Sequence, residues 1–181
     1  MDAARNRARI LAAAQELFVE QGQKVSLDKI ACRAGTGNAT VYRHFPERDA
    51  LLVEALERIA VAGADAAEEA AAQEDDPFAA LSRFAQAVAH ERLAALCCLS
   101  DELAAQCREL ARQRDRLVHA AQCLLTRAQQ ADQVRADVSL EEFMRAIIQL
   151  SRPLPGVSWA ATDQFSPRIL QLYLDGLYIA N

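Results

Sequence analysis

A short polar run near the N-terminus holds the residue types that bind DNA. Five of them fall within seven residues: Asn38, Thr40, Tyr42, Arg43 and His44. Val41 and Phe45, four residues apart, share one face of a helix and can be buried, which leaves the polar side chains outside. An amide, a hydroxyl, a phenol, a guanidinium and an imidazole together suit hydrogen bonding to base edges and phosphate oxygens in a major groove.

Two short helices must position this run. The first, which ends near Gly22, has an apolar face made of Ile10, Leu11, Ala14, Leu17 and Phe18. The second begins after Ser26, a good N-cap, and stops at Gly35, where a left-handed C-cap fits. Helices joined by a short glycine-containing turn are the helix-turn-helix signature. The alternative is a small helical bundle whose polar face is exposed to solvent and binds no partner.

Other groups flank the same surface. Lys24, Thr36 and Arg48 lie beside the polar run, and the N-terminus of the helix after Ser26 favours a phosphate. A basic arm precedes the first helix, and we expect it to be loose and either to reach the minor groove or to stay solvated. It consists of Arg5, Arg7 and Arg9.

The run from Ile30 to Leu52, with Tyr42-Arg43-His44-Phe45-Pro46 at its centre, resembles the signature of TetR-type repressors. The stretch from Ala13 to Gly22 does so too. The resemblance covers the first quarter of the chain.

By position, the resemblance implies that Tyr42 and His44 clamp phosphates and that Ser26 and Thr40 also touch the backbone. Arg48 stands where the family usually has lysine. The base-reading positions would be Asn38, Ala39 and Arg43. Asn38 stands where many members carry lysine or arginine, and Ala39 replaces a common glycine, so we expect a different operator rather than a loss of binding.

Length and charge favour two unlike parts. The chain has 181 residues and a formal net charge of −5. Residues 1–48 hold eight Lys or Arg against five Asp or Glu, whereas residues 49–181 hold twelve against twenty. We expect a DNA-binding domain over 1–48 and a regulatory and dimerisation domain over 49–181. With no signal peptide and no apolar run long enough for a bilayer, we expect a cytoplasmic protein without a membrane partner.

The sequence after residue 48 also predicts helices throughout. The chain is therefore expected to be all-α, with about nine helices. Asp76 and Pro77 open the fifth helix, and Ser139 with Glu142 forms a capping box for the eighth. We expect further helices at 47–73, 96–105 and 107–130, a loop over 152–164, and a last helix capped by Ser166.

The last two helices are apolar on most sides, so they need a partner beyond the core. A four-helix interface across a two-fold axis would make a homodimer, as the resemblance also implies. The alternative is burial within one subunit. The candidate interface residues are Met144, Ile148, Ile169, Leu172, Tyr173, Gly176 and Leu177.

The resemblance also implies a pocket for a small-molecule effector that releases the DNA. Its lining would suit an apolar or aromatic compound. The fourth helix would transmit the change, because we expect it alone to touch both halves. The candidate lining residues are Phe84, Gln86, His90, His119, Gln122, Phe143 and Ile147.

A second class of function is a thiol- or metal-sensing DNA-binding regulator. Its candidates are Cys97, Cys98, Cys107, Cys123, His90 and His119. Adjacent helical cysteines point about 100° apart, which disfavours a shared ion. An enzyme is a third class, but the sequence has no nucleophile elbow, phosphate loop or metalloprotease motif, and we expect no cofactor and no metal.

Overall fold

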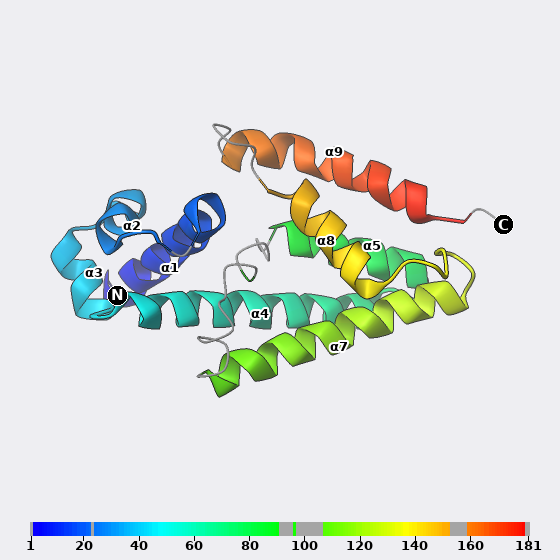
Figure 1. Cartoon of the computed structure of the whole chain (residues 1–181), viewed down its shortest axis with the longest axis horizontal. Helices are drawn as coiled ribbons and strands as arrows, with labels where there is room; N and C mark the ends of the chain where they lie inside the picture. Colours follow the sequence, from blue (N-terminus) through cyan, green and yellow to red (C-terminus); the bar gives the residue numbers. More distant parts are fainter. Residues whose placement is uncertain (1, 23, 91–95, 97–106, 153–158, 180–181) are drawn as a thin grey trace.

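The chain is built along one long helix. The computed structural model describes residues 2–22, 24–90, 96, 107–152 and 159–179 (Figure 1). The helices within these ranges are α1 (Asp2–Gln21), α2 (Leu27–Ala34), α3 (Asn38–His44), α4 (Arg48–Gln73), α5 (Pro77–His90), α7 (Arg108–Gln130), α8 (Leu140–Leu150) and α9 (Trp159–Leu177). They contain no strand, only an isolated bridge between Val134 and Tyr178. The all-α prediction is confirmed. Of the helix expected at 96–105, only residue 96 is described.

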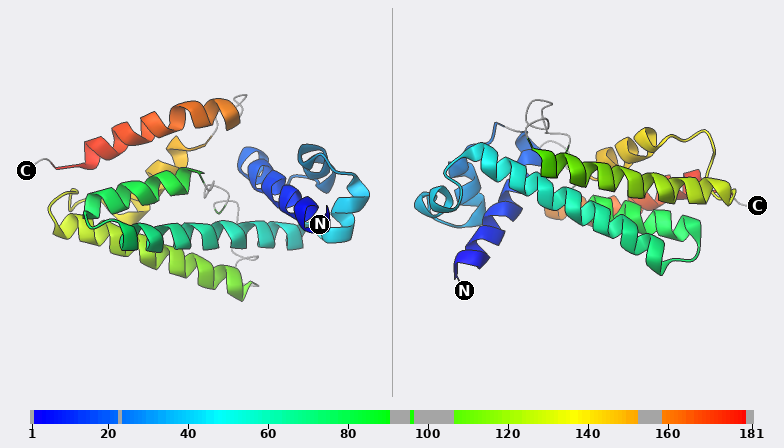
Figure 2. Two further views of the ribbon diagram at one scale, coloured as in Figure 1. Left: turned by 180° about the vertical axis from the view of Figure 1, so that it is seen from behind. Right: turned by 90° about the horizontal axis from the view of Figure 1, so that it is seen from below.

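Helix α4 contacts both ends of the molecule. Its first half buries large side chains, among them Leu52, Leu56 and Ile59, and α1 packs there. Its second half buries only small residues: Ala60, Gly63, Ala64, Ala67 and Ala70. Small side chains let helix axes approach closely, and α5 and α7 pack against α4 (Figures 1 and 2).

The C-terminal helices form a second layer over α5. Helices α8 and α9 both contact α5, and α9 runs along the outside of the molecule (Figure 1). The expected capping box of α8 is present, because Ser139 accepts from the Glu142 backbone while the Glu142 carboxylate accepts from the Ser139 backbone. Phe143 and Ile147 are the fully buried residues of this helix. No helix in the described ranges combines the length and the apolar character that crossing a bilayer requires.

The basic N-terminal arm is helical, so the expectation of a loose arm was wrong. Helix α1 already begins at Asp2. Arg7 binds the carboxylate of Glu54, and Arg9 donates to the carbonyl oxygen of Gly35 at 3.1 Å. Ala3, Ala4, Ala8 and the arginines themselves favour helix, and these tertiary contacts hold it.

Ser166 does not open the last helix, which begins at Trp159 and contains Pro167 in its interior. The sequence expectation of a loop over 152–164 was therefore wrong in its second half. A Ser-Pro pair reads locally as a helix start. Here Ser166 is buried, with its hydroxyl 3.4 Å from the carbonyl oxygen of Leu150, and Leu170 continues the buried face.

The inner face of α7 is apolar except at one position. His119 and Cys123, two of the candidate sensor residues, lie on this helix and are both exposed. The buried residues are Leu110, Gln113, Leu117, Ala121, Leu124, Leu125 and Ala128. The polar Gln113 therefore occupies an inner position, and the imidazole and the thiol lie on the solvent side.

Helix α4 is not the sole link between the two halves. Arg152, just after α8, lies with its Nη2 3.4 Å from the carbonyl oxygen of Val19 in α1. This contact joins residues far apart in sequence, and periodicity gave no signal for it.

The cap of α5 yields a stability prediction. Asp76 accepts from the Ala79 backbone at 2.7 Å and from Gln133 Nε2 at 2.6 Å. These hydrogen bonds, Ala79 first, hold the pKa of Asp76 below its ordinary value of 3.8. Asp76→Ala should lower the free energy of unfolding at neutral pH by about 1 kcal/mol, measured by urea denaturation.

The pH dependence of that loss is the control. A depressed folded-state pKa stabilises at pH values above the unfolded-state pKa, and this stabilisation disappears as the pH falls through the folded value. The deficit of Asp76→Ala should therefore shrink in acid. Asp76→Asn keeps an acceptor without the charge and should show a smaller deficit. A deficit that stays constant in acid would contradict the assignment.

Candidate nucleic-acid interface and effector pocket

The turn between α2 and α3 depends on one glycine. Ser26 caps α2 by accepting from the Lys29 backbone at 3.3 Å, as expected. Gly35 ends the helix in the left-handed region with φ of 59°. A Cβ atom there would lie 2.7 Å from Nη2 of Arg9. The left-handed backbone angle therefore selects glycine, whereas the flexible end of Arg9 could move away from an added Cβ.

Helix α3 is held by two apolar side chains. Val41 is fully buried and Phe45 is 2% exposed. Burying such side chains contributes about 1.5–3 kcal/mol each, which fixes the roll of a helix this short. Tyr42 is consequently 48% exposed, and Arg43 is exposed beside it.

The other predicted contact residues lie around Tyr42. Lys24, Ser26, Asn38 and Ala39 are exposed, and Thr36, Thr40, His44 and Arg48 are half-buried. The structure thus brings the predicted set to one end of the molecule, on and beside α3 (Figure 1).

Several of these side chains have partners within the chain. Asn38 Nδ2 donates to Asp28 at 2.7 Å, and Arg48 Nε donates to the carbonyl oxygen of Val25 at 2.9 Å. Tyr42 and Arg43 have no side-chain hydrogen bond to the described residues. Their polar atoms are therefore the ones most available to an incoming partner.

Arg7 is a structural residue that the sequence reasoning missed. Both of its terminal nitrogens bind the Glu54 carboxylate, the Nη2 contact at 2.6 Å, and the hydrogen bond to Glu54 raises the pKa of Arg7. Its guanidinium also lies 4.6 Å from the ring centroid of Phe45. Arg7 thus joins α1, the end of α3 and α4. Continuing the apolar helical periodicity upstream of Ile10 would have placed it in the helix.

The N-terminal and C-terminal parts of the chain both match known families. Residues 10–55 match the model for bacterial regulatory proteins of the tetR family. Residues 76–179 match the model for the C-terminal domain of SbtR-like transcriptional regulators. The chain belongs to the TetR family. It is therefore a DNA-binding transcriptional regulator, and the family is one of regulators rather than enzymes.

Solved TetR structures share the fold over nearly the whole chain. A transcription regulatory protein from Mycobacterium vanbaalenii is 32% identical, covers 98% of both chains and has a TM-score of 0.57. One from Streptomyces coelicolor is 27% identical, covering 97% of this chain and 99% of that one, with a TM-score of 0.62. LfrR from Mycobacterium smegmatis, solved in complex with proflavine, is 22% identical over 98% of both chains with a TM-score of 0.68, which shows the fold alone.

The curated relatives match over a shorter stretch. An HTH-type transcriptional regulator from Staphylococcus aureus is 40% identical over 58 residues, which is 32% of this chain and 31% of that protein. The match thus spans about a third of the relative's length.

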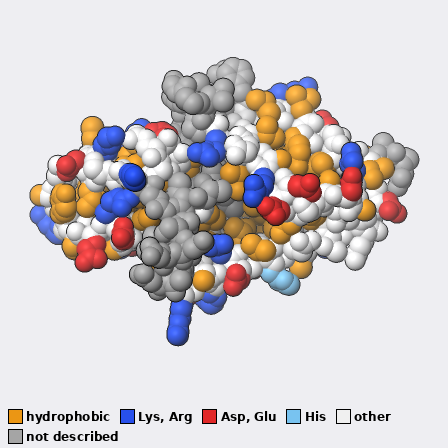
Figure 3. Space-filling model, viewed as in Figure 1, with side chains coloured by type: hydrophobic (Ala, Val, Ile, Leu, Met, Phe, Trp, Pro, Cys, Tyr) orange, Lys and Arg blue, Asp and Glu red, His pale blue; other side chains and the backbone are white. Residues whose placement is uncertain are grey.

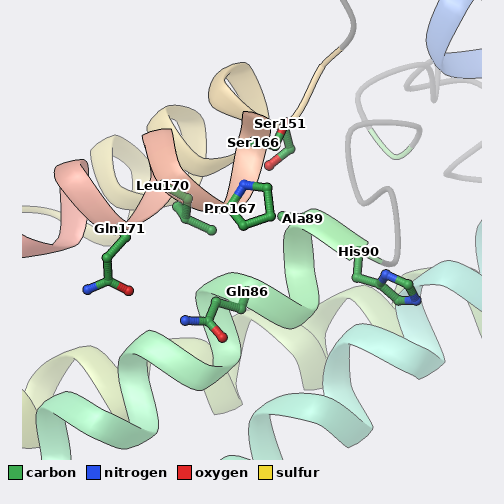
Figure 4. Close-up of a pocket in the computed structure, with 8 residues that line it drawn as sticks. All are labelled: Gln86, Ala89, His90, Ser151, Ser166, Pro167, Leu170 and Gln171. Carbon is green, nitrogen blue, oxygen red and sulfur yellow. The ribbon is translucent and has the colours of Figure 1, made fainter. Parts of the chain in front are cut away.

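One cavity lies between α5, the end of α8 and α9. It has a volume of about 480 Å³ and is lined by Gln86, Ala89, His90, Ser151, Ser166, Pro167, Leu170 and Gln171 (Figure 4). Of the predicted effector residues, only Gln86 and His90 line it. The sequence reasoning missed Ser166, because its polarity was already explained as a helix cap.

The other predicted effector residues lie elsewhere. Phe84, Phe143 and Ile147 are fully buried core residues. His119 and Gln122 are exposed on α7. The structure does not bring these five to the cavity.

The predicted dimer-interface residues differ in how exposed they are. Ile169 is 44% and Leu172 is 55% exposed on α9, where hydrophobic side chains reach the surface (Figure 3). Met144, Ile148 and Tyr173 are half-buried, with the Tyr173 ring 6.5 Å from that of Phe143. Gly176 is exposed with open space at its Cβ position, and Leu177 is buried in the core of its own chain.

The thiol candidates are only partly described. Cys97 and Cys98 lie outside the described residues. Cys107 precedes α7, and Cys123 lies 3.8 Å from His119 Nε2 on the exposed side of that helix. Over the ranges that the structure describes, no three His, Cys, Asp or Glu side chains are placed to hold a metal ion.

The geometry of α3 predicts two kinds of DNA phenotype. Tyr42→Ala and His44→Ala should weaken binding to all duplexes alike, whereas Arg43→Ala should relax preference at one base position by about 1–3 kcal/mol. Fluorescence anisotropy with specific and random duplexes separates the two effects.

Tyr178→Ala is the matched control, because it removes an exposed tyrosine from the opposite end of the chain. It should leave DNA affinity unchanged. If Tyr42→Ala bound as tightly as the unmodified protein, the assignment of α3 would fail.

Proposed function

We propose that this regulator is a repressor that binds a palindromic operator in double-stranded DNA as a homodimer and is released by a small-molecule effector. Residues 1–48 would read the DNA, and residues 49–181 would dimerise and bind the effector. The observation that carries the proposal is the division of α3 into a buried apolar side and an exposed side with Tyr42 and Arg43.

The exposure of the α3 side chains indicates how each of them would contact DNA. Arg43 has the donor geometry that recognises guanine, and Tyr42 and His44 beside it would contact the backbone phosphates next to an inserted helix. The Asn38 side-chain amide donates a hydrogen bond to the Asp28 carboxylate. Its amide keeps an unused oxygen and a second N–H, so it can still hydrogen-bond a base edge. The charge excess of residues 1–48 is small, which is why two copies on one duplex are needed.

Helices α8 and α9 are the proposed dimer interface. Ile169 and Leu172 are exposed large apolar residues on one helix, and Met144 and Ile148 on α8 are incompletely covered. A two-fold axis along these helices would bury both sets in a four-helix arrangement. Gly176 would permit close helix approach there. Leu177 is not part of the proposed interface, because its own core covers it.

The α5–α8–α9 cavity is the proposed effector site. Its volume suits a drug-sized compound, and Leu170 and Pro167 give apolar surface beside the amides of Gln86 and Gln171. The neighbouring Arg152 touches α1, so an occupant can act on the N-terminal helices through this contact. LfrR, a protein of the same fold, was solved with proflavine bound.

Selection of bound duplexes from a random pool is the direct test of the proposed function. We expect a palindromic consensus with half-sites about one helical turn, ~34–36 Å, apart. A consensus without dyad symmetry would contradict the homodimer, and recovery of no sequence would contradict operator recognition.

Leu172→Asp should prevent dimerisation without changing how one subunit binds a DNA half-site. A carboxylate in the proposed apolar interface should halve the mass seen by light scattering and weaken full-operator binding at least about tenfold. Affinity for a single half-site should stay unchanged. Val118→Asp is the matched control, since Val118 is 54% exposed on α7, and it should remain dimeric.

Ala89→Phe should separate effector response from DNA binding. The added ring would fill part of the cavity beside His90, so compounds found to raise the melting temperature and release DNA should lose both effects. Operator affinity without compound should be unchanged. An undiminished response in this variant would place the effector elsewhere.

A further inference from the structure

Asp28 places a carboxylate beside the proposed DNA-reading helix. It is exposed in the first turn of α2 and follows Leu27, whose burial holds that turn against the other N-terminal helices. Asp28 forms no ion pair with the residues that the structure describes, so no neighbouring cation neutralises its charge. A negative charge near a phosphate backbone weakens binding to every duplex alike. What else this carboxylate contributes depends on the partner that it does have.

That partner is Asn38, the first residue of α3. Asn38 Nδ2 donates to Asp28 Oδ1 at 2.7 Å, and both side chains are exposed. Helices α2 and α3 pack against each other, and the burial of Val41 fixes the roll of α3 (Figure 1). Tyr42, four residues after Asn38, lies on the same side of α3 and is exposed as well. The hydrogen bond therefore joins two fixed helices at the surface that is proposed to meet DNA.

The hydrogen bond determines which way the Asn38 amide points. An ionised carboxylate can only accept, so the amide nitrogen must face Asp28, and turning the amide over would place two oxygens against each other. One N–H is used by Asp28, which leaves Asn38 its second N–H and its oxygen. Asparagine reads adenine with these two groups, because the oxygen accepts from N6 and the N–H donates to N7. Guanine presents acceptors at both N7 and O6, so the outward oxygen of Asn38 opposes it.

Two other roles for Asp28 predict different base preferences. Gly37, the N-cap of α3, supplies no side-chain hydrogen bond, and a carboxylate beside a helix N-terminus is favourable. Such a structural role would affect all DNA sequences equally. Direct reading by Asp28 would instead select cytosine, whose N4 amino group donates to a carboxylate. A positioning role differs from both, because it acts on one base pair and only through Asn38.

We propose that Asp28 is a positioning residue that sets base preference: by holding the Asn38 amide, it selects adenine over guanine at the base pair that Asn38 contacts. This role rests on the proposed reading of an operator by α3. Without Asp28, the Asn38 side chain must be ordered each time DNA binds, which costs about two- to tenfold in affinity for adenine.

The test starts from the duplex that the unmodified protein selects from a random pool. Asn38→Ala identifies the base pair in question, because it removes the preference there. Fluorescence anisotropy with four duplexes, one for each base at this position, then measures the preference of the other variants. We expect the unmodified protein to prefer adenine. In Asp28→Ala, the preference for adenine over guanine should fall at least about threefold.

Two further variants separate positioning from charge and from direct reading. Adding Asp28→Ala to Asn38→Ala should leave the relative affinities for the four duplexes unchanged, because the amide that Asp28 positions is absent. Glu47→Ala is the matched control, since it removes another exposed carboxylate, just after α3, whose side chain makes no cap hydrogen bond. It should change the affinity for all four duplexes by the same factor.

Four results would overturn the role of Asp28 while leaving operator binding intact. They are that Asn38→Ala removes no base preference, that the position it identifies does not select adenine, that Asp28→Ala keeps the full preference, or that Asp28→Ala changes the preference when Asn38 is absent. Recovery of no sequence from the random pool would instead overturn the proposed function and, with it, this role.

Discussion

The buried face of α4 is the constraint on which the remaining structure depends. Its large residues, such as Leu52 and Leu56, are covered by the N-terminal helices, and its small residues, such as Gly63 and Ala67, are covered by α5 and α7. Neither set of neighbours can shift without exposing apolar surface or opening a gap, and interiors tolerate neither well. One continuous helix therefore fixes the distance and the direction between the proposed DNA-reading surface and the helices of the C-terminal part.

The three N-terminal helices are joined to one another and to α4 by charge as well as by packing. Arg33 binds Glu16 and Glu20, which joins α2 to α1, and Arg7 joins α1 to Glu54 on α4. These pairs are partly exposed, so each contributes little alone. They act on helices already fixed by apolar contacts, and their geometry selects one orientation. An effector that acts as proposed would therefore change where the whole N-terminal helical unit lies, rather than the shape of α3.

The elements that sequence predicted well are those whose signals are local. Ser26, Gly35 and the Ser139–Glu142 pair mark helix borders within one turn, and Val41 with Phe45 defines a buried side within one helix. The family signature was local too. The misassigned elements depend on distant partners: Arg7 needs Glu54, and Ser166 is buried against the end of α8. The effector residues were chosen for polarity near an apolar face, but lining a cavity depends on how three helices cross, which periodicity does not encode. The boundary at residue 48 stays a prediction.

The proposed release of DNA requires only a modest difference in binding free energy. An effector that weakens operator binding 100-fold must favour the released arrangement by about 2.7 kcal/mol. The α5–α8–α9 cavity is suited to this, because its lining includes Ser151, whose neighbour Arg152 touches Val19 on α1. An occupant that shifts the end of α8 changes this contact, whereas α4 is held along its full length and resists bending. The long helix then serves as the fixed support, and the short contact from α8 is the part that an effector can alter.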